Sequence, residues 1–158
     1  MAAHPSSEAP VSEFAGQLFF RLWRATHTRT ADALGAIDLT PALFALLNVV
    51  GAREGAIQQE LGATLGIDRS TMVSLIDQLE DAGLAKRRTS ATDRRAREVA
   101  ITPKGRRVLE RARRSIARVE DEVLAGLSGK ERAELLALLR RALDSAPAQP
   151  LWSAAEGD

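Results

Sequence analysis

The 158-residue sequence contains no cysteine and no tyrosine, and its only histidines are His4 and His27. The absence of cysteine excludes disulfides, thiolate catalysis and cysteine-based zinc sites. His4 lies in a tail that we expect to be disordered, and one ordered histidine cannot form a histidine-rich metal site. No HExxH motif or Ser-His-Asp spacing is present. We therefore expect no metal and no other cofactor, and we expect His27 to be an ordinary helix residue.

The sequence also lacks the features of a membrane protein, a secreted protein or an enzyme. No apolar run approaches the roughly 20 residues that a membrane-spanning helix requires. Residues 1–10 lack the basic start and apolar middle of a secretory signal. No phosphate-binding loop, nucleophile–base pair or carboxylate pair in an apolar setting is visible. These absences predict a cytoplasmic protein that has no membrane contact and is not an enzyme.

The charge of the chain is unevenly distributed, although its net value is only +1. Residues 86–118 contain 13 lysines or arginines and three acids, which gives this segment a balance of +10. The rest of the chain is acidic, with a balance of −9. One strongly basic segment in an otherwise acidic chain is typical of a surface that binds a polyanion.

Two helices are predicted in the first third of the domain. Apolar residues recur every three to four positions between Ser12, a candidate cap, and Gly35. Thr40 followed by Pro41 is typical of the start of a second helix, which we expect to end at Gly51. Residues 1–10 are rich in proline, serine and alanine and are expected to be disordered.

The stretch "AIQQELGATLGIDRSTMVSLIDQLEDAGLAKR", residues 56–87, predicts a helix-turn-helix motif. Ile57, Leu61 and Leu65 form a short apolar stripe, Gly66 allows a left-handed turn, and Asp68 can cap a second helix. The inward face of that helix is apolar, and Gly83 ends it. Its outward face is short-chained and poor in acids over the first two turns, which favours DNA contact over a solvated bundle helix. The outward residues are Arg69, Ser70, Thr71, Val73, Ser74 and Gln78.

Residues 84–88 and 96–101 predict a β-hairpin directly after this second helix, in the position of the wing of a winged helix. A charged hairpin can simply be a solvated surface, but its place in the chain favours a DNA contact. The charged residues that we assign to it are Arg87, Arg88, Asp93, Arg94, Arg95 and Arg97.

Two further helices complete the predicted domain. Thr102-Pro103 can cap and open a long helix, and Ser128 can cap a final leucine-rich helix. The predicted fold class is mainly α with a small β-hairpin (α+β): a winged helix-turn-helix over 40–102, flanked by dimerisation helices over 11–35 and 103–145. We expect a single domain over 11–145 and a disordered tail over 146–158.

Residues 12–145 resemble the MarR (multiple antibiotic resistance regulator) family of transcription factors. The family's wing signature is matched by Asp93, Arg95, the pair Ile101-Thr102, and Gly105. The segment "DRSTMVSLIDQLEDAGLAKR" is similar to the family's DNA-recognition helix and the turn that follows it. It departs from the common pattern at Val73, where serine or threonine is frequent, and at Ser74, where larger polar or basic residues are frequent.

This resemblance implies a homodimer that binds double-stranded DNA, with each recognition helix in a major groove and each wing near a minor groove. Arg95 suits a narrow minor groove, where Asp93 can hold it in place. Arg87, Arg88 and Arg94 are better placed for phosphates, which position the protein without specifying sequence. In the family, the effector binds between the first, second and fifth helices. The corresponding residues here are Phe19, Trp23, Leu46, Leu47, Val50 and Arg113, and a small aromatic or phenolic effector is the expected ligand.

The sequence therefore favours a ligand-responsive repressor that binds a pseudo-palindromic operator as a dimer. The alternative is a winged-helix module that assembles protein complexes without specific DNA contacts. The basic segment argues against this alternative, because such a module has no need of a basic wing.

Overall fold

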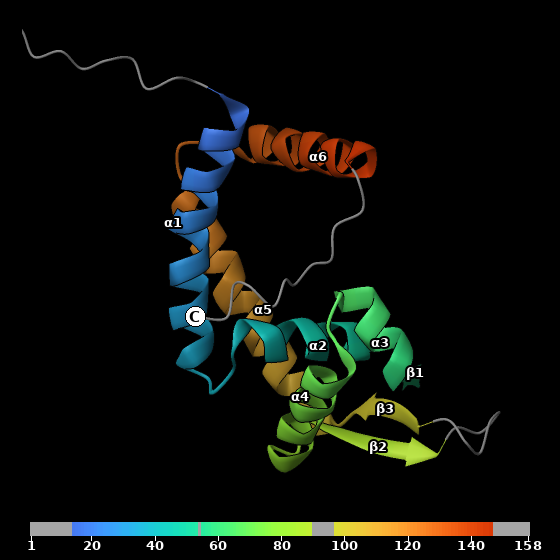
Figure 1. Cartoon of the computed structure of the whole chain (residues 1–158). Coiled ribbons are helices and arrows are strands. Elements are labelled where there is room, and N and C mark those ends of the chain that lie inside the picture. The colour runs from blue at the N-terminus through green and yellow to red at the C-terminus, as the bar shows by residue number, and fades with distance from the viewer. Residues whose placement is uncertain (1–13, 54, 90–96, 147–158) are drawn as a thin grey trace, which may run out of the picture.

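The computed structural model describes residues 14–53, 55–89 and 97–146 (Figure 1). The helices and strands are α1 (Ala15–Gly35), α2 (Pro41–Ala52), β1 (Ala56–Ile57), α3 (Gln58–Leu65), α4 (Arg69–Asp81), β2 (Ala85–Thr89), β3 (Arg97–Ile101), α5 (Pro103–Val123) and α6 (Gly129–Ser145). This order confirms the predicted fold class: a mainly α-helical chain with a small antiparallel sheet. None of the described helices is long and apolar enough to cross a membrane.

The elements form a stem, a lobe and a projecting helix (Figure 1). Helices α1 and α5 pack along each other and make the stem. Helices α2, α3 and α4 and the three strands form the winged-helix lobe at one end of the stem, and α6 projects from the other end. Of the predicted tails, residues 1–10 and 146–158, all but Ala146 lie outside the described residues.

Side-chain caps start four of the helices where the sequence predicted them. Thr40 Oγ1 accepts from the amide of the third residue of α2, and Asp68 accepts from two amides of α4. Thr102 Oγ1 accepts from the amide of Gly105 at 2.9 Å, and Ser128 forms a reciprocal capping box with Glu131. Each bond satisfies an amide that the first helical turn leaves without a partner. Ser12, the predicted cap of α1, lies outside the described residues.

Several boundaries differ from the sequence prediction, including those of the hairpin strands, which are Ala85–Thr89 and Arg97–Ile101 rather than 84–88 and 96–101. Ile57 does not belong to the stripe of α3, because Ala56–Ile57 form strand β1, which pairs antiparallel with Val99 and Glu98 of β3. The sheet therefore has three strands, in the order β1-β3-β2. Helix α2 ends at Ala52, one residue beyond the predicted Gly51. A two-residue strand has too few residues to show an alternating pattern, so the sequence alone does not predict it.

The core lies inside the lobe and its junction with the stem. Gly66 (φ +67°) turns the chain between α3 and α4, and the predicted inward face of α4 is fully buried. This confirms the helical phase that the sequence predicted for α4. The largest fully buried side chains are Leu34, Leu46, Leu47, Val50, Leu61, Met72, Ile76, Leu79 and Val99. Helix α6 contributes no buried residue.

Candidate nucleic-acid interface

The outward face of α4 is exposed along its whole length. All six residues predicted to contact DNA lie on it: Arg69, Ser70, Thr71, Val73, Ser74 and Gln78. Val73 keeps 37% of its surface exposed, although its neighbour Met72 is buried. An exposed valine flanked by short polar side chains can make an apolar contact with one base, while its polar neighbours form hydrogen bonds with adjacent bases.

Asp68 sets the hydrogen-bonding direction of the first two polar residues of this face. Its carboxylate accepts from the hydroxyls of Ser70 at 2.5 Å and Thr71 at 2.6 Å, as well as from both backbone amides. The hydroxyl bonds from Ser70 and Thr71 hold the pKa of Asp68 well below its usual range. Since an ionised carboxylate only accepts hydrogen bonds, both hydroxyls donate to it and leave only their lone pairs for an external partner.

Ser74 and Gln78 form a second polar pair one turn further along α4. The side-chain amide of Gln78 lies 3.3 Å from both the Ser74 carbonyl and the Ser74 hydroxyl. These bonds are long and both residues are exposed, so little energy holds the amide against its own helix. Gln78 is therefore available to present its amide to an adenine edge, the base whose paired donor and acceptor an amide matches.

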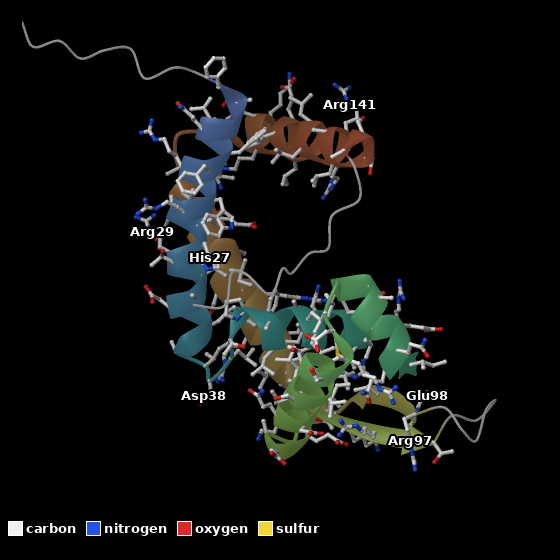
Figure 2. All side chains as sticks on the ribbon, viewed as in Figure 1. His27, Arg29, Asp38, Arg97, Glu98 and Arg141 are labelled. Atoms are coloured by element: carbon white, nitrogen blue, oxygen red, sulfur yellow. The ribbon has the colours of Figure 1, made fainter. Side chains whose placement is uncertain are left out.

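The hairpin β2–β3 lies beside α4, as predicted for a wing. Arg97 lies on β3 at the end of the described hairpin (Figure 2), where Thr89 of β2 accepts from its guanidinium at 3.1 Å. Arg88 is half exposed and pairs with Glu98 of β3 at 2.9 Å. Asp93, Arg94 and Arg95, the predicted wing tip, lie outside the described residues.

Arg87, which the sequence predicts as a phosphate contact, is paired with two acids of α4. Its guanidinium points back to α4 and pairs with Asp77 at 2.6 Å and with Glu80. The sequence analysis did not predict functional roles for these two acids. The sequence does contain a signal for these ion pairs: both acids lie near the end of α4, and an arginine follows soon after the turn that ends the helix.

The basic segment 86–118 is divided between the lobe and the stem. Arg107, Arg111, Arg114 and Arg118 follow one another at helical spacing on the exposed face of α5. Helix α5 rises from the lobe along the stem, so this row leads away from α4 (Figure 1). The local balance of +10 is therefore not confined to the winged-helix lobe.

Comparisons with known proteins agree with this arrangement. Residues 37–96 match a family model described as MarR family. The chain is 36% identical over 131 residues to a protein of Thauera aromatica described as a transcriptional regulatory protein for the hcr operon, an alignment that covers 80% of this chain and 79% of that protein. This chain belongs to the MarR family of transcriptional regulators.

Two solved structures show the same likeness over most of the chain. The repressor CouR, bound to a 23-mer DNA duplex, is 33% identical, with a TM-score of 0.74 and coverage of 89% of this chain and 99% of CouR. The regulator PcaV of Streptomyces coelicolor, in complex with its natural ligand, is 30% identical, with a TM-score of 0.65 and coverage of 93% and 100%. Both are similar to this MarR-family chain in sequence and in fold.

The residues predicted for a MarR effector site fall into two groups. Leu46, Leu47 and Val50 of α2 are fully buried in the core. Phe19 and Trp23 of α1 are about half exposed. The buried three can form only the floor of a site, and its walls would have to come from more exposed residues around them.

Arg113, the sixth predicted residue, links α5 to α2. Its Nη2 and Nε donate to Asn48 Oδ1 at 2.8 and 3.2 Å, and its Nη1 pairs with Glu110 at 2.9 Å. The guanidinium therefore spans the junction between the stem and the lobe. An anion bound there would compete with Asn48 and Glu110 for the same donors.

The exposed side of α1 carries an aromatic row. Trp23 stacks on His27 with ring centroids 4.7 Å apart and on Phe20 at 6.1 Å. Nearer the start of α1, an open groove is lined by Gly16, Gln17, Phe20 and Arg21, and shares no residue with the predicted effector site. Within the described residues, no three His, Asp or Glu side chains are grouped so as to hold a metal ion.

Proposed function

We propose that this MarR-family regulator binds double-stranded operator DNA through α4 and the β2–β3 hairpin. The observation that carries the proposal is the outward face of α4: it is exposed and polar, while the opposite face is fully buried. The face therefore contributes little to the fold of the protomer and is free to contact DNA. The similarity to CouR, whose structure contains a DNA duplex, supports this function.

We assign base contacts to the exposed face of α4. Ser70 and Thr71 would accept from adenine or cytosine amino groups, because their hydroxyl protons are engaged by Asp68. Val73 would contact a thymine methyl, Ser74 and Gln78 would contact adjacent base edges, and Arg69 would contact a phosphate.

We assign the wing contacts to the arginines that the described ion pairs leave accessible. Arg97 is exposed at the end of the described hairpin and suits a phosphate, and half-exposed Arg88 can contribute a second one. From sequence alone, Arg94 remains a predicted phosphate contact, and Arg95, held by Asp93, remains the predicted minor-groove contact.

We further propose that the working unit is a homodimer formed by α1 and α6. No residue of α6 is buried within the chain, yet the helix carries exposed Leu136, Leu138 and Leu143. A 17-residue helix with such an uncovered apolar face is not stable in water without a partner. The exposed aromatic residues of α1 provide a second apolar surface at the same end of the stem (Figure 1).

Light scattering at micromolar concentration is expected to give twice the 17.0 kDa mass of one chain. Leu138→Glu places a charge on the uncovered face and is expected to shift the population toward monomer. Two-fold symmetry then requires a pseudo-palindromic operator with half-sites about one helical turn apart. A monomeric mass for the unmodified chain at this concentration would rule out the dimer.

We propose that a small aromatic or phenolic effector lowers the affinity for DNA, so that the regulator acts as a repressor. CouR from Rhodococcus jostii has been solved with p-coumaroyl-CoA, and PcaV with its natural ligand. In this chain Trp23 and Phe19 are the exposed aromatic candidates, with Arg113 as the cation for an acidic group. The proposal assigns the chain no catalytic step and places it in the cytoplasm, where the DNA of a bacterium lies.

Selection from a random-sequence duplex library, followed by gel shifts at two salt concentrations, tests DNA binding directly. We expect a palindromic duplex to be enriched and bound in preference to a scrambled duplex of equal composition. Affinity for both should fall as salt rises, because bound phosphates release counterions. A winged-helix module that only assembles proteins would enrich no sequence, which is the outcome that would refute the proposal.

A further inference from the structure

Arg87 of β2 joins the hairpin to about two turns of the recognition helix. Its backbone amide donates to Glu80 Oε1 at 2.5 Å, and its guanidinium donates to the other oxygen of the same carboxylate. The same guanidinium pairs with Asp77 at 2.6 Å and lies 3.4 Å from the Val73 carbonyl. One side chain therefore contacts α4 at positions 73, 77 and 80.

This guanidinium is committed to the protein rather than available to DNA. Only a quarter of the Arg87 side chain is exposed. Burial disfavours its charge, but the hydrogen bonds to Asp77 and Glu80 outweigh this effect and raise the pKa of Arg87. A move toward a phosphate would leave two carboxylates unpaired beside the DNA, and like charge in that position opposes binding.

The three contacts lie next to the DNA-facing stripe of α4. Residues 73, 77 and 80 follow one another at helical spacing, and Ser70, Ser74 and Gln78 occupy the adjacent stripe. A contact spread over about 10 Å of helix resists both rotation of α4 about its axis and sliding along β2. Rotation by one residue would bring Asp77 and Glu80 toward the DNA in place of the polar stripe.

We propose that Arg87 is a positioning residue that locks the recognition helix to the wing and thereby supports specific, rather than non-specific, DNA binding. The proposal rests on the DNA-binding function proposed above. Specific binding requires α4 and the hairpin to meet two grooves at a fixed separation. Non-specific binding uses phosphates alone and tolerates a change in that separation.

The variant that tests this role is Arg87→Lys, with Arg114→Lys as its control, because Arg114 is exposed on α5, on the row that leads away from the recognition helix. Lysine keeps the charge but cannot form the forked contact to two carboxylates and a carbonyl. Binding isotherms are measured on the selected duplex and its scrambled counterpart over a range of salt concentrations. We expect Arg87→Lys to weaken binding to the selected duplex about tenfold or more, because an Arg-to-Lys change is not conservative at a forked site. Binding to the scrambled duplex and the salt slope should remain unchanged, and Arg114→Lys should affect neither duplex.

Glu80→Gln gives an independent test, because simple electrostatics and the positioning role of Arg87 predict opposite effects on binding. Removal of an anion near DNA strengthens binding to both duplexes if charge alone matters. Positioning by Arg87 predicts weaker binding to the selected duplex instead. Melting curves establish whether each variant is folded at the assay temperature. If Arg87→Lys is unfolded, the test rests on Glu80→Gln, which retains the ion pair between Arg87 and Asp77.

Three outcomes are distinguishable. Equal losses on both duplexes in Arg87→Lys would make Arg87 a phosphate contact, which positions without specifying sequence, and would overturn the proposal. An unchanged ratio of specific to non-specific affinity in both Arg87→Lys and Glu80→Gln would also overturn it. If the unmodified protein shows no preference for the selected duplex, the proposed function itself fails before any variant is compared.

Discussion

Val73→Asp is expected to abolish binding to the selected duplex while leaving the thermal midpoint nearly unchanged. Val73 lies at the centre of the exposed face of α4 and is 37% exposed. A carboxylate there loses the apolar contact to a base and adds repulsion from the base acceptors and the phosphates. Valine and aspartate have similar helix propensities, so the change in the free energy of unfolding should stay within about 0.5 kcal/mol.

Val73→Thr is the matched control, because threonine keeps the branched shape and one methyl group. We expect it to retain most of the affinity for the selected duplex. Affinity is measured by fluorescence anisotropy on the selected and scrambled duplexes, and stability by thermal unfolding at one fixed protomer concentration. A fall in stability as large as the fall in affinity would mean that Val73 supports the core.

The sequence predicted most of the fold because its signals are local. A capping residue, a proline at the first helical position or a glycine with positive φ acts within four residues of itself. Thr102 and Gly66 therefore mark their boundaries without knowledge of the tertiary structure. Strand β1 has no such signal: Ala56–Ile57 is extended because β3, about 40 residues further along the chain, offers its free edge.

The candidate site was predictable to the extent that it depends on helical phase. The exposed and buried sides of α4 follow from a 3.6-residue period, so the outward residues were identified correctly as exposed. The direction of Arg87 was not predictable from that period. Whether Arg87 faces DNA or the neighbouring helix depends on where Asp77 and Glu80 lie in space. The sequence alone shows Arg87, Asp77 and Glu80 only as three charged residues.

In the basic segment, residues 86–118, the number of charges likewise does not show how many of them can contact DNA. Arg87 and Arg88 are paired with acids of α4 and β3, and the α5 row leads away from the lobe (Figure 1). The number of arginines in a segment therefore overstates the number that can reach a DNA phosphate. The dependence of the DNA affinity on salt concentration measures the number of phosphates that the protein contacts.

Gly105→Ala is expected to destabilise the protein, although alanine favours helices. Gly105 lies in the first turn of α5, and a Cβ atom on it would lie 2.0 Å from the Leu84 carbonyl oxygen. That oxygen accepts from the Thr102 amide at 3.0 Å, which ties the start of α5 to the turn between α4 and β2. The obstacle is backbone, so α5 must move away and weaken this bond. Overpacking of this kind costs about 1–3 kcal/mol, more than the roughly 1 kcal/mol that alanine gains over glycine inside a helix.

Gly129→Ala is the matched control, since Gly129 lies in the first turn of α6 and a Cβ there meets no atom within 4 Å. Urea unfolding at one protomer concentration should give a lower midpoint for Gly105→Ala, and an unchanged or higher one for Gly129→Ala. Because neither glycine has a positive φ, backbone strain cannot account for a difference between the two variants. The close approach to Leu84 would then explain why this position of the wing signature carries glycine. Equal midpoints would show that α5 can shift without loss, and that the contact with Leu84 does not hold the stem to the lobe.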